Sequence, residues 1–176
     1  MNQQAMENLL TRRSVKKYRS TPVPEELIEK IVEAGTYAAT GRNLQAPIIL
    51  AITNGQVRDE LRKMNAKFMG MSEDSDPFYG APVVLVVLAD KNVRTHVYDG
   101  SLVMGNLMLA AHALGLGSCW IHRAKEEFET EQGKALLASL GVSGEYEGIG
   151  HCVIGYADGE EPAAKPRKND WVYYVR

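Results

Sequence analysis

Apolar or small residues occupy nearly every position of the stretch 102–116, where Asn106 and His112 are the strongly polar exceptions. A helix that is apolar on all sides offers no face to water, so it belongs in a core or in a large interface. The Gly-Leu-Gly sequence at 115–117 predicts the end of this helix, because glycine favours a helix C-terminus. Residues 118–122 then have the composition of a short buried strand.

A membrane span is the alternative interpretation of so long an apolar run. Polar residues and glycines interrupt the run, and no basic cluster flanks it. We therefore expect no membrane association from this segment, but a central helix that leads into a central strand.

Three more apolar runs have the length of a strand, at 48–53, 82–89 and 148–156. The run at 82–89 contains no polar residue, which predicts a strand buried on both faces in the middle of a sheet. Apolar residues at helical spacing predict further helices at 3–11, 25–38, 55–69 and 126–140. Asn54 can cap the helix at 55–69. Helices that alternate with four apolar strands predict a mixed α/β (α+β) fold, a three-layer α-β-α sandwich.

Two segments stand outside this regular pattern. The loop at 70–80 is longer than most connections, and either a lid or a merely solvated loop would fit it. Residues 160–170 contain two prolines and no apolar side chain larger than alanine, so the chain from 157 onward is expected to form an extended arm. The β-prone residues 171–175 that follow have no domain left to cover them. They predict pairing with another chain or, as the alternative, a local edge strand.

The chain totals set limits on the class of protein. A length of 176 residues fits one domain, and a net charge of −2 with a pI near 6.1 argues against nucleic acid and anionic membranes as partners. The N-terminus lacks the basic and apolar regions of a signal peptide, which favours a cytoplasmic protein. In that setting Cys119 and Cys152 are expected to be buried free thiols.

Side-chain catalysis is not indicated by any motif. The four histidines show no metal-ligand spacing, and Cys119 with His122 would supply only two ligands, so we expect no metal site. No P-loop, dinucleotide fingerprint or nucleophile elbow is present. The chemistry therefore depends on a borrowed cofactor, or the protein is not an enzyme.

Two basic clusters are the best functional candidates. Arg12, Arg13, Ser14 and Lys16 can converge on a phosphate, because arginine supplies a bidentate fork, serine a short donor and lysine a point charge. The second cluster spans 165–168 on the extended arm. Taken alone, the first cluster could equally be a solvated helix end, and the second a solvated turn.

A family resemblance joins these features. The arginine pair with serine at 12–14, PVPEELIEKIVEAG at 22–35, TGRNLQ at 40–45, LAAHALGLGSCWI at 109–121 and KPRK at 165–168 occur together and in this order. The chain resembles the FMN-dependent nitroreductase family over nearly its whole length. The resemblance implies a single domain over 1–176, in an intertwined homodimer that holds FMN at the interface, with the arm at 157–176 exchanged between subunits.

The resemblance also assigns site residues. It implies that Arg12, Arg13 and Ser14 hold the phosphate and ribityl end of FMN, that Lys165 and Arg167 close on the same phosphate, and that Lys16 lies near the pyrimidine edge. A cation there stabilises negative charge on the reduced ring. The partner subunit's flavin would be reached by Thr40, Gly41, Asn43 and Gln45, and the central ring would lie beside Trp120, Ile121 and His122. Well-known members have an acidic residue and glycine where this chain has His122 and Arg123, which leaves the preferred electron donor open.

The function implied by the resemblance is an NAD(P)H oxidoreductase with ping-pong hydride transfer. NADH or NADPH would reduce the flavin, and a nitro-compound, quinone or similar electron-poor acceptor would then take the electrons. A non-catalytic flavin-binding or redox-sensing protein on the same scaffold is one alternative. A dimer that binds some other phosphate and no flavin is another.

Overall fold

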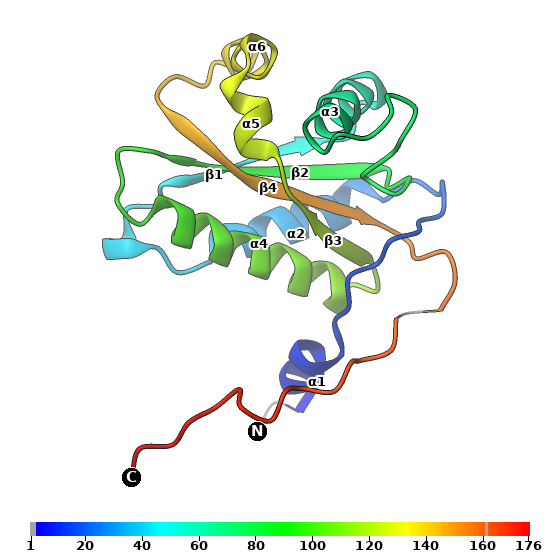
Figure 1. Ribbon diagram of the computed structural model, residues 1–176, viewed down its shortest axis with the longest axis vertical. Helices are drawn as coiled ribbons and strands as arrows, with labels where there is room; N and C mark the ends of the chain where they lie inside the picture. The colour runs from blue at the N-terminus through cyan, green and yellow to red at the C-terminus, as the bar shows by residue number, and fades with distance from the viewer. Residues whose placement is uncertain (1–2, 161) are drawn as a thin grey trace.

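The fold is built around one four-stranded sheet, seen edge-on in Figure 1. A computed structural model of the chain describes residues 3–160 and 162–176. The strand order is β1-β2-β4-β3, and all neighbouring strands are antiparallel. The strands are β1 (Pro47–Ile52), β2 (Val83–Asp90), β3 (Gly117–Ile121) and β4 (Tyr146–Gly155). The structure thus confirms the four strands that the apolar runs predict.

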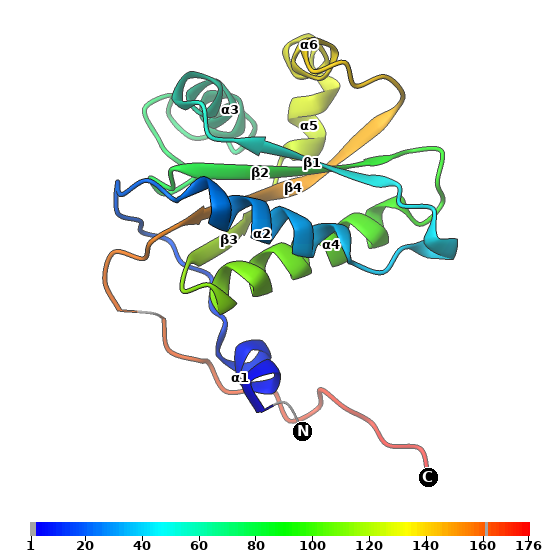
Figure 2. The ribbon, with the colours of Figure 1, turned by 180° about the vertical axis from the view of Figure 1, so that it is seen from behind.

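Helices cover both faces of the sheet and complete the predicted three layers (Figures 1 and 2). One face is covered by α2 (Glu25–Thr36) and α4 (His96–Ala113), and the other by α3 (Gly55–Phe68), α5 (Ala124–Glu129) and α6 (Glu131–Ser139). Strand β2 is buried throughout Val83–Ala89, with alternate side chains in the two apolar cores. This burial explains why that run has no polar residue.

The helix ends follow local capping chemistry. The Asn54 side chain accepts hydrogen bonds from the backbone N–H of Gln56 (2.9 Å) and Val57 (3.1 Å), so it caps α3 as its position predicts. The single helix predicted over 126–140 is two helices, α5 and α6. They are separated at Thr130, whose backbone is extended and whose hydroxyl accepts from the N–H of Gly133 at 3.0 Å.

Helix α4 begins at His96, earlier than the apolar run, and only its inner side is buried in this chain. Its inner face packs against the sheet through Val103, Leu107 and Ala111, among others. Its outer face leaves Tyr98 73% exposed and Leu102 51% exposed. None of the described helices is long and apolar enough to cross a membrane.

The two ends of the chain meet beside β3. Ser14 bridges to Ser118, and Tyr18 pairs with Ala157 at the root of the arm. Beyond these contacts α1 (Gln3–Thr11) lies at the C-terminal end of α4, and the arm leaves the body of the molecule and passes beside α1 in both views (Figures 1 and 2). Residues 171–175 form no strand within the described chain, so their pairing with another chain stays a prediction.

The long loop at 70–80 is fixed to α3. Arg58 forms an ion pair with Asp76 at 2.7 Å, and Phe78 is fully buried. Arg62 donates hydrogen bonds to the carbonyls of Glu73 and Ser75, both at 2.6 Å. These contacts fix the loop in place, which argues against the lid interpretation.

Candidate functional site

The first basic cluster lies against the edge strand β3. The N–H of Val15 donates to the Ser118 carbonyl at 3.0 Å, which aligns the preceding residues with the strand. Burial raises the pKa of the Cys119 thiol, while a hydrogen bond from Ser14 and the positive charges of Lys16 and Arg12 oppose that rise. Arg12, Ser14 and Lys16 thus all act on the Cys119 thiol of β3, and their joint contact with a phosphate stays a prediction.

Arg12 has a buried donor atom that the part of the chain described by the structure leaves unpaired. Its Nη1 atom is buried and has no hydrogen-bond partner among the described residues. A buried guanidinium donor without a partner is costly, and a phosphate oxygen is the acceptor that suits it. The first basic cluster thus contains a guanidinium donor that no other described residue satisfies.

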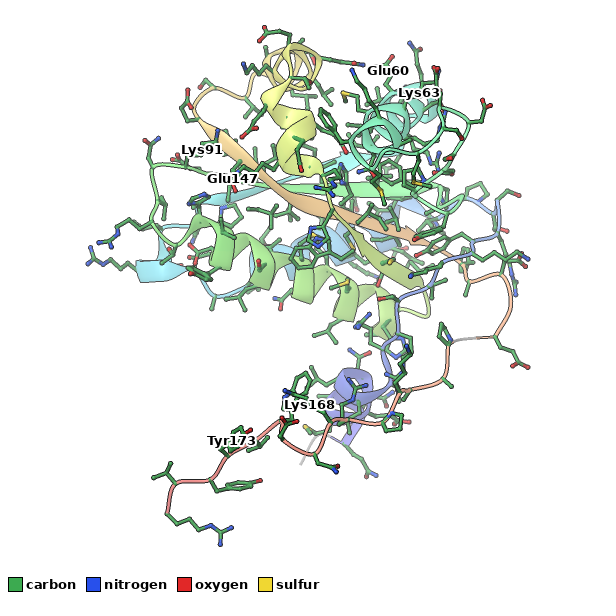
Figure 3. All side chains as sticks on the ribbon, in the orientation of Figure 1. Glu60, Lys63, Lys91, Glu147, Lys168 and Tyr173 are labelled. Atoms are coloured by element: carbon green, nitrogen blue, oxygen red, sulfur yellow. The ribbon has the colours of Figure 1, made fainter. Side chains whose placement is uncertain are left out.

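Arg13 faces another way. Its Nη1 donates to the carbonyls of Leu10 and Arg12, both at 2.8 Å, so it caps the C-terminal end of α1. Its proposed contact with a phosphate stays a prediction. Lys165 and Arg167 are exposed on the arm and form no hydrogen bond or ion pair with another described residue, so their role also stays a prediction. Figure 3 shows their neighbour Lys168 on the part of the arm that passes α1.

The loop at 40–45 lies at the N-terminal end of α4, whereas α1 and the basic cluster that follows it lie near the C-terminal end. The N–H of Gly41 donates to the Asp99 carboxylate at 3.0 Å, and the Thr95 hydroxyl donates to the same carboxylate at 2.9 Å. Three residues other than glycine, Arg42, Asn43 and Gln45, have φ values of 53°, 56° and 50°. Left-handed backbone at such residues is costly and is concentrated at ligand sites and switches.

Within one chain this loop is remote from Arg12. The other end of α4 is attached to α1 by hydrogen bonds from Asn8 to the Leu109 carbonyl (3.0 Å) and between Thr11 and His112 (2.8 Å). Asp99 and His112 are about 20 Å apart along the helix, from its rise per residue. The chain therefore does not bring its own Thr40, Gly41, Asn43 and Gln45 to Arg12, and their contact across a dimer stays a prediction.

The segment Trp120–Arg123 continues from the basic cluster along β3. Trp120 is half-buried, Ile121 is buried and His122 is exposed, and the Trp120 and His122 rings are 5.9 Å apart between centroids. A cleft of about 530 Å³ opens beside them, lined among others by Val97, Ser101, Arg123 and Glu147. From Ser118 to His122, one residue beyond the end of β3, the extended chain covers about 13 Å, a span suited to a ligand with an anionic end and a flat ring.

Charged groups line the far side of this cleft. The Glu147 side chain lies near the start of β4 (Figure 3) and accepts from Lys125 at 3.1 Å. His96 lies 3.8 Å from the same carboxylate. Among the described residues, no group of three or more His, Cys, Asp or Glu side chains is arranged to hold a metal ion. Cys119 and Cys152 are buried free thiols, which confirms the prediction.

Sequence reasoning missed a buried polar network behind the end of β3. Asn65, Glu127 and His151 are all fully buried and come from α3, α5 and β4. Asn65 donates to Glu127 at 2.6 Å, and His151 lies 3.0 Å from the other oxygen of that carboxylate. No sequence signal links these residues, because they are far apart in the chain and none belongs to a motif.

Comparison with known proteins agrees with this geometry. The sequence profile of the Nitroreductase family matches residues 9–161. A protein of Archaeoglobus fulgidus named for NADH dehydrogenase and NAD(P)H nitroreductase is 30% identical over 145 residues, which cover 80% of this chain and 78% of that protein. A protein of Methanothermobacter thermautotrophicus with the same name is 31% identical over 119 residues, which cover 65% of this chain. The match spans 59% of the length of that second relative.

A solved structure agrees over the full length. The crystal structure of a nitroreductase with bound FMN from Bacteroides fragilis superposes with a TM-score of 0.87, covers 100% of both chains and is 26% identical. The profile match and the likeness of fold therefore agree. The chain belongs to the nitroreductase family.

Proposed function

We propose that the protein is an FMN-dependent oxidoreductase that takes electrons from NADH or NADPH and passes them to a nitro-compound, a quinone or a similar electron-poor acceptor. The observation that carries this proposal is the buried, unpartnered Nη1 of Arg12, with Ser14 and Lys16 beside it. The names of the archaeal relatives and the FMN in the Bacteroides fragilis structure support the same choice of donor and cofactor.

The residues along β3 follow the order of the parts of FMN, from its phosphate to its ring. Arg12 and Ser14 would bind the phosphate, and Lys16 would place a positive charge near the ring. Trp120 would cover part of the ring and exclude water from it. When bound, FMN supplies the redox chemistry, and so no nucleophile or general base is required of the side chains. The donor and the acceptor would bind in turn at the same cleft.

We also propose that the active form is a homodimer. The outer face of α4 and the apolar side of α1, including Leu102, Leu9 and Leu10, are exposed in the single chain. A two-fold axis that packs α4 against its copy in antiparallel fashion would bury these residues. It would also bring the loop at 40–45 of the partner subunit to the Arg12 cluster, which completes a site that one chain leaves divided between the two ends of α4.

The absorption spectrum of the purified protein, recorded anaerobically before and after addition of NADPH and then NADH, tests the enzymatic proposal. We expect visible flavin bands that bleach with at least one nicotinamide and return when a nitro-compound or quinone is added. Flavin bands that persist with both nicotinamides would favour the non-catalytic flavin protein. A colourless protein with no affinity for added FMN would favour a site for some other phosphate.

A further inference from the structure

The buried network of Asn65, Glu127 and His151 does not reach the cleft, but it holds the backbone that does. Both amide hydrogens of Asn65 are used, one donated to Glu127 at 2.6 Å and one to the backbone carbonyl of His122 at 2.7 Å. Both partners are acceptors, so the orientation of the Asn65 amide is set by chemistry. The carboxylate of Glu127 is in turn fixed by His151 at 3.0 Å.

Stability alone is a weak reason for such a network. Buried charged and polar groups lose hydration, and apolar residues of the same volume often stabilise a core equally well or better. The network also leaves the Oδ1 of Asn65 and the Nδ1 of His151 buried and without partners among the described residues. An arrangement kept at this cost requires another reason, and the contact with His122 supplies one.

The contact fixes the direction of the next peptide group. The chain has no cis peptide bond among its described residues, and in a planar trans peptide the C=O and the following N–H point in opposite directions. Because Asn65 holds the carbonyl of His122 toward α3, the N–H of Arg123 must point away from α3. Trp120, His122 and Arg123 line the cleft described above.

Close packing on glycine holds the same segment in place on either side. A Cβ added at Gly150 would overlap the Trp120 ring, and one at Gly148 would overlap the backbone of Ala124. Arg123 lies between these contacts with a left-handed backbone, φ 84° and ψ 2°. The peptide between His122 and Arg123 is therefore held in a conformation that costs energy at a residue with a side chain.

We propose that Asn65, supported by Glu127 and His151, is a positioning residue that directs the N–H of Arg123 toward the ring of the bound flavin. The inference rests on the proposed function, because it needs FMN in this cleft. A fixed N–H donor at the ring stabilises negative charge on the reduced cofactor and raises its midpoint potential. The network acts from behind the strand and contacts neither cofactor nor substrate.

The test compares Asn65→Ala with Leu61→Ala in the full-length protein. Leu61 is on the same helix, is 1% exposed and belongs to the same apolar core, but it makes no hydrogen bond to His122. We expect both variants to lose thermal stability. Only Asn65→Ala should bind FMN about tenfold more weakly, lower the midpoint potential of the bound flavin and, without FMN, speed amide hydrogen exchange in residues 120–126.

Conservative replacements keep the test decisive. Glu127→Gln retains an oxygen that accepts from Asn65, whereas Glu127→Leu does not. The Gln variant should therefore have an FMN affinity and a flavin midpoint potential closer to those of the unmodified protein. Asn65→Ser serves in place of Asn65→Ala if the latter does not fold.

The outcomes separate the two proposals. Equal changes in FMN affinity and potential for the Asn65 and Leu61 variants, or no change in either, would show that the network serves folding only and would overturn the inference. The proposed function would survive that result if the unmodified protein binds FMN and is bleached by a nicotinamide. An unmodified protein that binds no FMN would overturn both.

Discussion

The two faces of the sheet differ in how far the chain itself covers their apolar side chains and pairs their charged groups. On the face covered by α3, α5 and α6, charged groups either pair within the chain, as Arg58 and Asp76 do, or point to solvent. Figure 3 shows Glu60 and Lys63 projecting outward from α3. On the face of α4, and along α1 and the arm, apolar side chains such as Leu102 (51%) and Tyr173 (81%) are exposed.

This difference suggests separate roles for the two faces, one in supporting the cleft and the other in dimer assembly and ligand binding. The first face holds the Asn65 network behind the end of β3, so it can fix the backbone that lines the cleft. The second face has unfilled donors and uncovered apolar surface, which a second copy and a phosphate ligand would satisfy. We infer that the closed face is set by folding, and that the open face is completed only on assembly and binding. Each prediction below perturbs one face and uses the other as its reference.

The largest expected effect is on the closed face. Glu127→Ala leaves Asn65 and His151 buried without their shared partner, so we expect it to lower the free energy of unfolding by about 3–5 kcal/mol. Urea unfolding followed by circular dichroism measures this at fixed protein concentration. Glu129→Ala, at an exposed position of the same helix, should change it by less than about 0.5 kcal/mol. Equal midpoints for the two variants would contradict the importance of the network.

The next effect is on the open face. Leu102→Asp places a charge on the outer face of α4, where a two-fold axis would set it close to its copy. We expect the dimer to be weakened by at least about 2 kcal/mol, or roughly thirtyfold in dissociation constant. Light scattering after size-exclusion chromatography, over a dilution series, measures this change.

Leu140→Asp is the matched control for that substitution. Leu140 has a similar exposure of 55% and lies on the closed face, at the end of α6. It should leave the oligomeric state unchanged. A Leu102→Asp protein that stays dimeric at all concentrations would mean that another surface joins the subunits.

Removal of the Arg12 side chain, the proposed hydrogen-bond donor to the phosphate, should have a somewhat smaller effect. Arg12→Ala loses a charge-assisted hydrogen bond of about 1.5–3 kcal/mol, so FMN should bind about ten to a hundred times more weakly. Titration of the apoprotein with FMN, followed by flavin fluorescence, measures this. Arg19→Ala removes an exposed arginine from the same segment and should change the affinity little. Equal affinities for both variants would place the phosphate elsewhere.

The sequence predicted those features that depend on local pattern. Periodicity and composition identified the strands, most of the helices and the buried β2, because a strand covered on both faces tolerates no polar residue. Asn54 was found as a cap by its position alone. The break at Thr130 was missed although its signal was present, since threonine is a good N-cap.

Other features depend on contacts between distant segments. Asn65 and His151 are polar residues in ordinary amphipathic or apolar contexts, and only the fold brings them to Glu127. The resemblance implied that the loop at 40–45 serves the partner subunit. The physical reason, namely its place at the far end of α4 from Arg12, requires the structure. The basic cluster at 12–16 was predicted from residue chemistry, and the roles of the other site residues were predicted from the resemblance. Binding measurements test both.

The smallest expected effect concerns the root of the arm, where Lys17 forms an ion pair with Asp158. A hydrogen bond from Lys17 at 2.6 Å, followed by its positive charge, lowers the pKa of Asp158. The folded-state pKa is thus below the unfolded value of about 3.9. The stabilisation is therefore fully present above pH about 4 and is lost as the pH falls through the folded-state pKa. Both side chains are largely exposed, so the contribution is small and screened by salt.

We expect amide hydrogen exchange at residues 156–160, corrected for its intrinsic pH dependence, to lose protection below pH about 4 at low salt. Asp158→Asn should lose the same protection at neutral pH and show no further loss on acidification. Asp59, whose pKa is lowered by hydrogen bonds from Arg62 and Lys63 on the closed face, provides the reference. Asp59→Asn should leave exchange at 156–160 unchanged, because α3 is remote from the arm. Protection that is independent of both pH and Asp158 would show that the backbone pairing of Tyr18 with Ala157 holds the arm by itself.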